Sequence, residues 1–181
     1  MTWRYGAFEL DPSVPSWGVD RDSYMAGRYD PAAIKAMGER LAQIARREGL
    51  TMADPAAQTV RPNTFAAHRL MAAAVQSGVQ VQQALGDALF AACWSRAEDV
   101  GDREVLLEAA HAAGMDVEEA AAVLAGAAFT DEVRAQERDA ALRGIHAVPT
   151  FVFADHLVVS GAQDPEFLAQ AARQALALPQ P

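Results

Sequence analysis

Apolar residues recur at helical spacing through most of the middle of the chain. Asp30 and Pro31 form a helix-start signal, the apolar residues that follow recur every three or four positions, and Gly49 provides a stop. The same criteria predict further helices over residues 64–75, 81–97, 102–114, from 116 onward, and 130–144. Residues 30–144 are therefore predicted to form a nearly continuous helical array.

The two ends of the chain have a strand-like pattern instead. Residues 2–10 contain aromatic and branched side chains that could line one strand, and a turn rich in proline and aspartate follows them. Residues 148–153 and 157–160 are also strand-like, and the segment between them is short enough for a hairpin. An amphipathic helix is predicted from Pro165. A strand so distant from the hairpin makes a poor sheet unless another strand joins the two.

The composition favours a helical globular protein. The chain has 181 residues, enough for one domain with an insertion or for two packed lobes, and 51% of them are hydrophobic. It carries 15 basic and 24 acidic residues, so its formal net charge is −9. Such a charge would repel a phosphate backbone, and we therefore expect no nucleic-acid partner.

The N-terminal sequence bears on the cellular location of the protein, and the cysteine count restricts the disulfide and metal chemistry that it can perform. No run of about 18 apolar residues is present, and Arg4, Glu9 and Asp11 stand where a signal peptide would be apolar. We therefore expect a cytoplasmic protein with no membrane partner. The single cysteine, Cys93, excludes a disulfide framework or a thiolate zinc site within the chain. Its apolar helical neighbours predict a buried and unreactive thiol.

Four short segments occur in a fixed order along the chain. They are Phe8-Glu-Leu-Asp-Pro12, Asn63-Thr-Phe-Ala-Ala-His-Arg-Leu70, Val148-Pro-Thr-Phe-Val-Phe153 and Ser160-Gly-Ala-Gln163. Together they resemble the FrnE-like branch of the DsbA family in order and spacing, over essentially the whole chain. The resemblance implies an α/β, thioredoxin-like fold of the DsbA type with a large helical insertion. It implies a thioredoxin-like lobe of residues 1–15 and 145–181, and an insertion lobe with its connections over residues 16–144.

The sequence departs from this family in one respect. The resemblance implies a first strand and a first helix, whose start carries Cys-x-x-Cys, before the strand that ends in a segment like residues 8–12. Here that second strand is the first element, so we expect the chain to lack the family's first strand, first helix and redox cysteines. In the family fold the absent strand lies between the strand of residues 2–10 and the hairpin.

The absent cysteines determine the expected activity. In disulfide exchange one thiolate attacks a disulfide, and a second nearby cysteine resolves the mixed disulfide that forms. The family that this chain resembles consists of thiol–disulfide oxidoreductases. We nevertheless expect this chain to be inactive in disulfide exchange, and we assign no catalytic residue within it.

The resemblance places a binding site for a thiol ligand at Val148, Pro149 and Thr150. The overall frequency of cis X-Pro bonds favours a trans bond before Pro149. The matching proline of the family, however, is cis and faces the reactive sulfur. The backbone of the residue before it pairs with an extended thiol-bearing ligand, and this role falls on Val148.

Gly161, Ala162 and Gln163 form a second candidate binding loop. They precede a predicted helix, so their amides could hold an anionic group. The matching loop does this in relatives that bind glutathione. An ordinary loop, with Asp164 capping the helix, is the equally weighted alternative.

Asn63, Thr64 and His68 are candidate residues of a cleft, because they belong to a family-like segment. Simpler roles are favoured for two of them: Asn63 as a helix cap, and His68 as an exposed residue or one hydrogen-bonded between lobes. The remaining histidines show no metal-ligand spacing, so we predict no metal site.

Five large aromatic residues could line an apolar cleft between the lobes. Core packing is the commoner fate of such side chains and is the favoured prediction. These residues are Trp3, Trp17, Phe90, Trp94 and Phe129.

Three functions remain open at the level of sequence. The first is a thiol–disulfide oxidoreductase whose cysteine pair is encoded upstream of Met1, which the in-frame DNA would decide. The second is a glutathione-dependent isomerase or transferase, with glutathione as substrate and no cofactor. The third is a non-catalytic binding paralogue, for which an open sheet edge predicts a homodimer or strand donation. The expected partner is a peptide or small molecule that bears a thiol or a disulfide.

Overall fold

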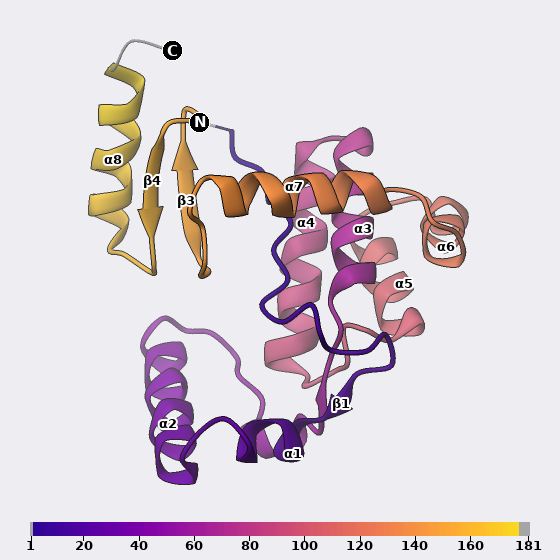
Figure 1. The fold of residues 1–181 in the computed structure, drawn as a ribbon, viewed down its shortest axis with the longest axis vertical. Coiled ribbons are helices and arrows are strands. Elements are labelled where there is room, and N and C mark those ends of the chain that lie inside the picture. Colours follow the sequence, from indigo (N-terminus) through magenta and orange to yellow (C-terminus); the bar gives the residue numbers. More distant parts are fainter. Residues whose placement is uncertain (1, 178–181) are drawn as a thin grey trace. The chain divides into compact units, whose positions relative to one another are not determined.

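The computed structural model describes residues 2–177 and contains two compact units, whose elements are drawn in Figure 1. One unit comprises Met1–Arg134 and the other Ala135–Pro181, so the boundary falls inside helix α7 (Thr130–Leu142). Residues 1–15 belong to the first unit by their contacts. Their predicted membership of one thioredoxin-like lobe with residues 145–181 stays a prediction.

Four helices pack around the main hydrophobic core of the first unit. Leu70, Leu85 and Leu106 are fully buried in this core, and most of its other buried residues are alanines. The small side chains let the helices approach closely, and the leucines fill the space between them. These helices are α3 (Phe65–Ala74), α4 (Val79–Phe90), α5 (Arg103–Ala112) and α6 (Val117–Ala125).

Aspartates cap several helices where the sequence predicted helix starts. Asp30 before α2 (Pro31–Arg47), Asp102 before α5 and Asp116 before α6 each accept a hydrogen bond from a backbone N–H of the first turn, at 2.7–2.9 Å. Each cap satisfies a donor that the helix itself leaves unpaired. The helices predicted from residues 30, 102 and 116 are thereby confirmed.

A short pair of strands in the first unit was missed by the sequence pattern. β1 (Val19–Asp20) pairs antiparallel with β2 (Val60–Arg61), and two residues are too few to show a period. Gly18 adopts a φ of +74°, and a Cβ there would lie 2.7 Å from Val60 Cγ1, so glycine is required. Helix α1 (Arg21–Ala26) and the 3₁₀ turn η1 (Pro55–Ala57) were also not predicted. The 3₁₀ turn η2 (Val75–Ser77) directly follows α3, and the π-helical turn η3 (Ala91–Ser95) lies within the helix predicted over residues 81–97.

Helix α2 exposes much of its apolar side. Met37, Leu41 and Ile44 are 38–52% exposed, and Ala45 is the buried residue of the helix. The amphipathic spacing therefore predicted the helix correctly without predicting burial. The predicted homodimer stays a prediction.

Residues 2–10 do not form a strand, so that prediction is wrong. A buried side-chain amide takes the place of a neighbouring strand: Gln82 Oε1 accepts from the Tyr5 N–H at 3.0 Å, and Gln82 Nε2 donates to the Tyr5 carbonyl at 3.1 Å. Gly86 lies against the Tyr5 ring, where a Cβ would be 2.4 Å from Cε2. The segment thus packs on α4, and a helix side chain satisfies backbone groups that a strand partner would otherwise pair.

Most of the aromatic residues expected in the core are exposed. Trp17 is 82% exposed, and Trp3, Phe90 and Trp94 are each about half exposed. Phe129 does pack against buried residues. The core prediction is therefore wrong for the other four, whose rings lie at the surface while leucine and alanine side chains fill the core.

The second unit contains the predicted hairpin and final helix. β3 (Thr150–Phe153) pairs antiparallel with β4 (Leu157–Ser160), and α8 (Pro165–Ala177) packs against both strands. The connecting turn places Ala154 and Asp155 at φ values of 47° and 62°. The predicted strand–turn–strand–helix order of this region is confirmed.

Candidate functional site

The two binding loops proposed in the second unit meet at the open end of the hairpin. Thr150 and Ser160 are opposite each other at this end of the strand pair. Beyond them, the Gly161 N–H donates to the Pro149 carbonyl at 2.8 Å. This hydrogen bond holds the segment that contains Val148 and Pro149 next to the loop that begins at Gly161.

The first of these loops presents an exposed backbone and an apolar side chain. The Val148–Pro149 peptide bond is cis, which the resemblance implies and the overall X-Pro frequency does not. The Val148 side chain is 45% exposed. Thr150 Oγ1 donates to the Ala147 carbonyl at 2.7 Å, so the hydroxyl proton is used within the loop while the oxygen can still accept a hydrogen bond.

The second loop offers fewer free donors than its sequence suggested. The Gly161 N–H is bonded to Pro149, and Gln163 Nε2 donates to the Ser160 carbonyl at 3.2 Å. Ala162 is exposed. Two exposed carboxylates, Asp164 and Glu166, follow at the start of α8 and make this end of the unit negative.

The hairpin has an open edge and an exposed apolar pair. Within residues 2–177, β3 is hydrogen-bonded to β4 alone. Val152 and Val158 lie opposite each other and are 38% and 41% exposed. The rings of Phe151 and Phe153 occupy the other face, stacked with centroids 6.4 Å apart. A strand with apolar side chains on both faces is typical of a sheet whose two faces are both buried by other parts of the protein.

Asn63, Thr64 and His68 lie in the first unit, at the start of α3. The Asn63 side chain is fully engaged: Nδ2 donates to the Val14 carbonyl at 2.7 Å, and Oδ1 accepts from the Phe65 N–H at 2.9 Å. Asn63 therefore satisfies the first N–H of α3, although the N-cap residue itself is Thr64, which makes no side-chain cap. Thr64 precedes the first helical residue, and the partly buried His68 donates its backbone N–H to the Thr64 carbonyl at 3.0 Å.

Arg69, next to His68, is a buried charge that sequence reasoning missed. It is only 8% exposed, and its guanidinium donates to the carbonyls of Val123, Gly126 and Ala128. These carbonyls belong to the C-terminal turn of α6 and the loop after it, where unpaired acceptors and the helix dipole favour a cation. Arg69 thus has a structural role.

Glu9, from the first family-like segment, also has a structural partner. Its side chain is 3% exposed and forms an ion pair with Arg134. The Arg134 guanidinium lies 4.0 Å from the centroid of the Phe65 ring. These contacts join the N-terminal segment, α3 and the start of α7 within the first unit.

Asp11 organises the turn that follows this segment. Its carboxylate accepts hydrogen bonds from Ser13 Oγ and from Tyr24 Oη, the latter at 2.7 Å, and Arg28 lies 3.8 Å away. Chiefly through the Ser13 and Tyr24 hydroxyl groups, these contacts lower the pKa of Asp11 to about 2. The carboxylate is thereby held ionised as part of the turn.

The Cys93 thiol is not activated. It is partly buried in η3, and Gln58 Nε2 lies 3.3 Å from its sulfur. Burial raises the pKa of Cys93, and the hydrogen bond from Gln58 opposes this only in part. A thiol with a raised pKa is a poor nucleophile at neutral pH, because little of it is thiolate.

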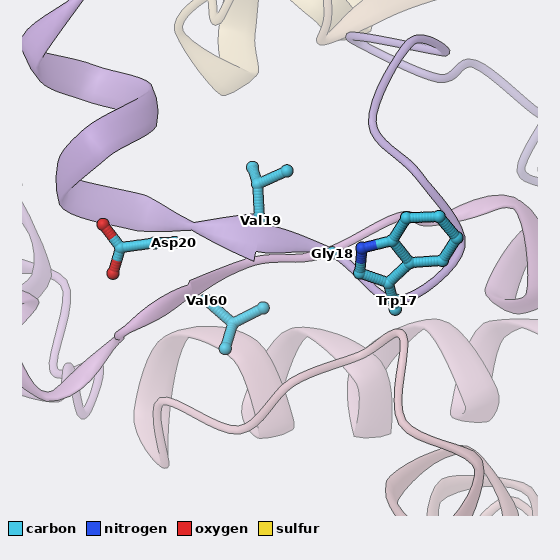
Figure 2. A pocket seen from close by; sticks show the side chains of 5 residues that line it. All are labelled: Trp17, Gly18, Val19, Asp20 and Val60. Atoms are coloured by element: carbon cyan, nitrogen blue, oxygen red, sulfur yellow. The ribbon is translucent and has the colours of Figure 1, made fainter.

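A shallow depression of about 400 Å³ surrounds β1. Trp17 lines it, but none of the residues proposed to bind a thiol ligand does. Figure 2 shows the Trp17 ring on the turn before β1, with the Val19 and Val60 side chains on either side of the paired strands. The Asp20 carboxylate on its rim caps α1 by accepting from the Ser23 N–H at 2.8 Å. The depression therefore offers no group suited to thiol chemistry.

Residues 2–177 contain neither clustered metal ligands nor a membrane-spanning helix. No group of three or more His, Cys, Asp or Glu side chains in this range could hold a metal ion. None of its helices is both long and apolar enough to cross a membrane.

Comparison with known proteins defines the family. Residues 1–173 match the model of the DSBA-like thioredoxin domain. The chain therefore belongs to the DSBA-like thioredoxin family, and the expected α/β, thioredoxin-like fold of the DsbA type is confirmed. It is similar to the crystal structure of a probable DsbA oxidoreductase from Streptomyces coelicolor, with 36% identity and a TM-score of 0.81 over 96% of this chain and 75% of that one. No curated protein matches the chain.

Proposed function

We propose that this chain is the ligand-binding body of a FrnE-like thiol–disulfide oxidoreductase. The observation that carries the proposal is the junction at the open end of the hairpin. There the Gly161 N–H is hydrogen-bonded to the Pro149 carbonyl, and Val148 is exposed beside the open edge of β3. An extended peptide can pair with such a backbone. The similar bacterial protein, a probable DsbA oxidoreductase, supports the same class of reaction. A cytoplasmic location stays a prediction.

The proposed reaction needs two sulfurs that act together. One thiolate of a dithiol attacks a substrate disulfide and releases a substrate thiol; the second thiol then displaces the other substrate sulfur, so that the dithiol is oxidised and the substrate reduced. The 181 residues contain one cysteine, and burial raises the pKa of its thiol. We therefore propose that they bind the ligand but do not perform the exchange alone.

The expected inactivity of the chain in disulfide exchange can be tested with insulin as the substrate. The 181-residue chain should leave the dithiothreitol-driven reduction of insulin at its uncatalysed rate, because no second sulfur can resolve a mixed disulfide. Turbidity of the precipitating insulin B chain measures the rate. Cys93→Ser is the matched control and should give the same baseline. A rate above the baseline that disappears in Cys93→Ser would contradict the proposed inactivity.

Binding of an extended peptide at the open end of the hairpin can be tested separately from exchange. The probe is the acetylated and amidated peptide Val-Gln-Cys-Val-Gln-Val with its cysteine S-methylated, which has no net charge and cannot exchange sulfur. Titrating it into the ¹⁵N-labelled chain should shift the amide resonances of Val148, Thr150, Gly161 and Ala162 most strongly, because β-strand pairing perturbs backbone amides directly. Reduced glutathione in a parallel titration probes the small-molecule alternative. If neither ligand shifts these resonances, the proposed function is wrong.

A further inference from the structure

Helix α2 carries a line of apolar side chains that the first unit leaves uncovered. Met37, Leu41 and Ile44 are 38–52% exposed, and the partly exposed Ile34 continues their line toward the start of the helix. Within the first unit, no other helix or strand packs along α2. A helix in a protein owes most of its stability to packing of its amphipathic face. The uncovered face of α2 is therefore typical of an interaction surface.

The spacing of these four residues fits a single facing helix. They are separated by three, four and three positions, which is the spacing of the two apolar positions in each heptad of a coiled coil. We call this line of four residues the α2 seam. Residues 31–47 contain no aromatic side chain, whereas helices that lie on a membrane usually carry tryptophan or phenylalanine on their apolar face. The seam therefore favours a protein helix over a lipid surface.

The two edges of the α2 seam differ. At one edge Ala45 is buried, and a Cβ on Gly38 would lie 3.7 Å from Pro55 Cγ, so the chain itself occupies that side. At the other edge lie Arg40 and Arg47, which are exposed and one heptad apart, or about 10 Å along the helix. A helix that packs on the seam must therefore lie beside the two arginines.

The charge of α2 is opposite to that of the chain as a whole. Residues 31–47 contain four basic side chains and one acidic side chain, whereas the chain carries a formal net charge of −9. Arg47 forms an ion pair with the adjacent Glu48 at 2.9 Å, but both side chains are more than half exposed, and such surface pairs contribute little. Acidic residues of a partner would be attracted to this edge. A second copy of α2 would instead bring a helix of the same positive charge, which repulsion disfavours.

We propose that the exposed side of α2 is a docking surface for an amphipathic helix of a partner protein, in which glutamate or aspartate residues lie beside an apolar seam. Apolar side chains of that helix would pack between those of the α2 seam, and its carboxylates would pair with Arg40 and Arg47. The surface contains none of the residues proposed to bind a thiol ligand, so the inference does not depend on the proposed function.

Two helical peptides of opposite charge test the proposal. One consists of three repeats of Glu-Ile-Ala-Ala-Leu-Glu-Lys and the other of three repeats of Lys-Ile-Ala-Ala-Leu-Lys-Glu, so both present the same apolar seam. Each is acetylated and amidated, and is titrated into the ¹⁵N-labelled chain at about 50 mM salt. The acidic peptide should shift the amide resonances of Met37 and Leu41 and should bind at least about fivefold more tightly than the basic one, because ion pairs replace repulsive contacts. The net charge of −9 alone would give the opposite order.

Matched variants locate the effect on α2. Arg40→Gln/Arg47→Gln should remove most of the preference for the acidic peptide. The control Lys35→Gln/Arg46→Gln removes the same charge from the opposite side of the helix and should keep most of the preference. Leu41→Gln should weaken binding of the acidic peptide by at least about tenfold, because it places a polar group in the middle of the seam. Circular dichroism checks that each variant is folded.

Equal affinities, tighter binding of the basic peptide, or equal loss of preference in the two double variants would overturn the inference. Failure of both peptides to bind would do the same. Sedimentation with vesicles of phosphatidylcholine and phosphatidylserine, and light scattering over a range of concentrations, test the other two occupants of the surface. Vesicle binding or dimerisation that Leu41→Gln abolishes, in a chain that does not bind the acidic peptide, would assign the surface to a membrane or to a second copy and would overturn the proposal.

Discussion

Replacing Arg69 with methionine should lower the free energy of unfolding of the first unit by about 4 kcal/mol. The guanidinium is buried and donates to the carbonyls of Gly126 at 2.6 Å and Ala128 at 2.8 Å, as well as to that of Val123. Methionine fills similar space but leaves these acceptors without their donors, and each buried unpaired acceptor costs roughly 1–3 kcal/mol. Urea unfolding followed by tryptophan fluorescence measures the change, because all three tryptophans lie in the first unit.

A buried charge is not always stabilising, so the controls decide this prediction. Replacing a buried ion pair with apolar residues can be neutral, since desolvation of the charges then disappears. Here the partners of Arg69 are backbone carbonyls that remain in place after substitution. Arg69→Lys should lower the free energy of unfolding by about half as much as Arg69→Met, because an ammonium group cannot span the same three acceptors. Arg40→Met, on the exposed face of α2, should change stability by less than about 0.5 kcal/mol. A loss below about 1 kcal/mol in Arg69→Met would contradict the assigned role.

The elements that the sequence predicted are those stabilised by neighbours along the chain. Asp102 and Asp116 cap helices through N–H groups two or three residues away, and the hairpin closes through a turn between adjacent strands. Residues 2–10 failed as a strand because their backbone partner is Gln82, 77 positions from Tyr5. No local pattern distinguishes a strand that pairs with a strand from a segment that pairs with a buried glutamine.

The candidate site was likewise predictable only where its contacts are local in the sequence. The junction of Pro149 with Gly161 follows from the hairpin register, so two loops flagged in the sequence were bound to meet once the hairpin formed. The engagement of the Gly161 amide, by contrast, depends on the conformation of the loop and was not foreseeable from its composition. Arg69 was overlooked because arginine on a helix is ordinarily exposed, and the carbonyls that bind it lie more than 50 positions away.

Replacing Gln82 with leucine should cost the first unit about 3 kcal/mol of stability. The amide is 2% exposed; its oxygen accepts from the Tyr5 N–H, and its nitrogen donates to the carbonyls of Tyr5 and Met71, both at 3.1 Å. Leucine preserves the volume but removes all of these partners at once. Gln83→Leu is the matched comparison on the same helix, since it removes a single hydrogen bond to the Trp3 carbonyl from an exposed setting. Gln83→Leu should lower the free energy of unfolding by less than about 1 kcal/mol.

Gln82→Glu separates the pairing role of this amide from its packing. A carboxylate can still accept from the Tyr5 N–H, but only the protonated acid can donate to the Tyr5 or Met71 carbonyl. Burial and these two acceptors favour the protonated form in the folded state, so the pKa of the introduced glutamate should rise above its unfolded value of about 4.3. The variant should accordingly be most stable below pH 4.3 relative to the native chain and should lose stability as pH rises through the folded pKa. Urea unfolding of both chains between pH 4 and pH 8 measures the difference. A difference independent of pH would show that Gln82 acts by filling space, and that the N-terminal segment is held by packing on α4 instead.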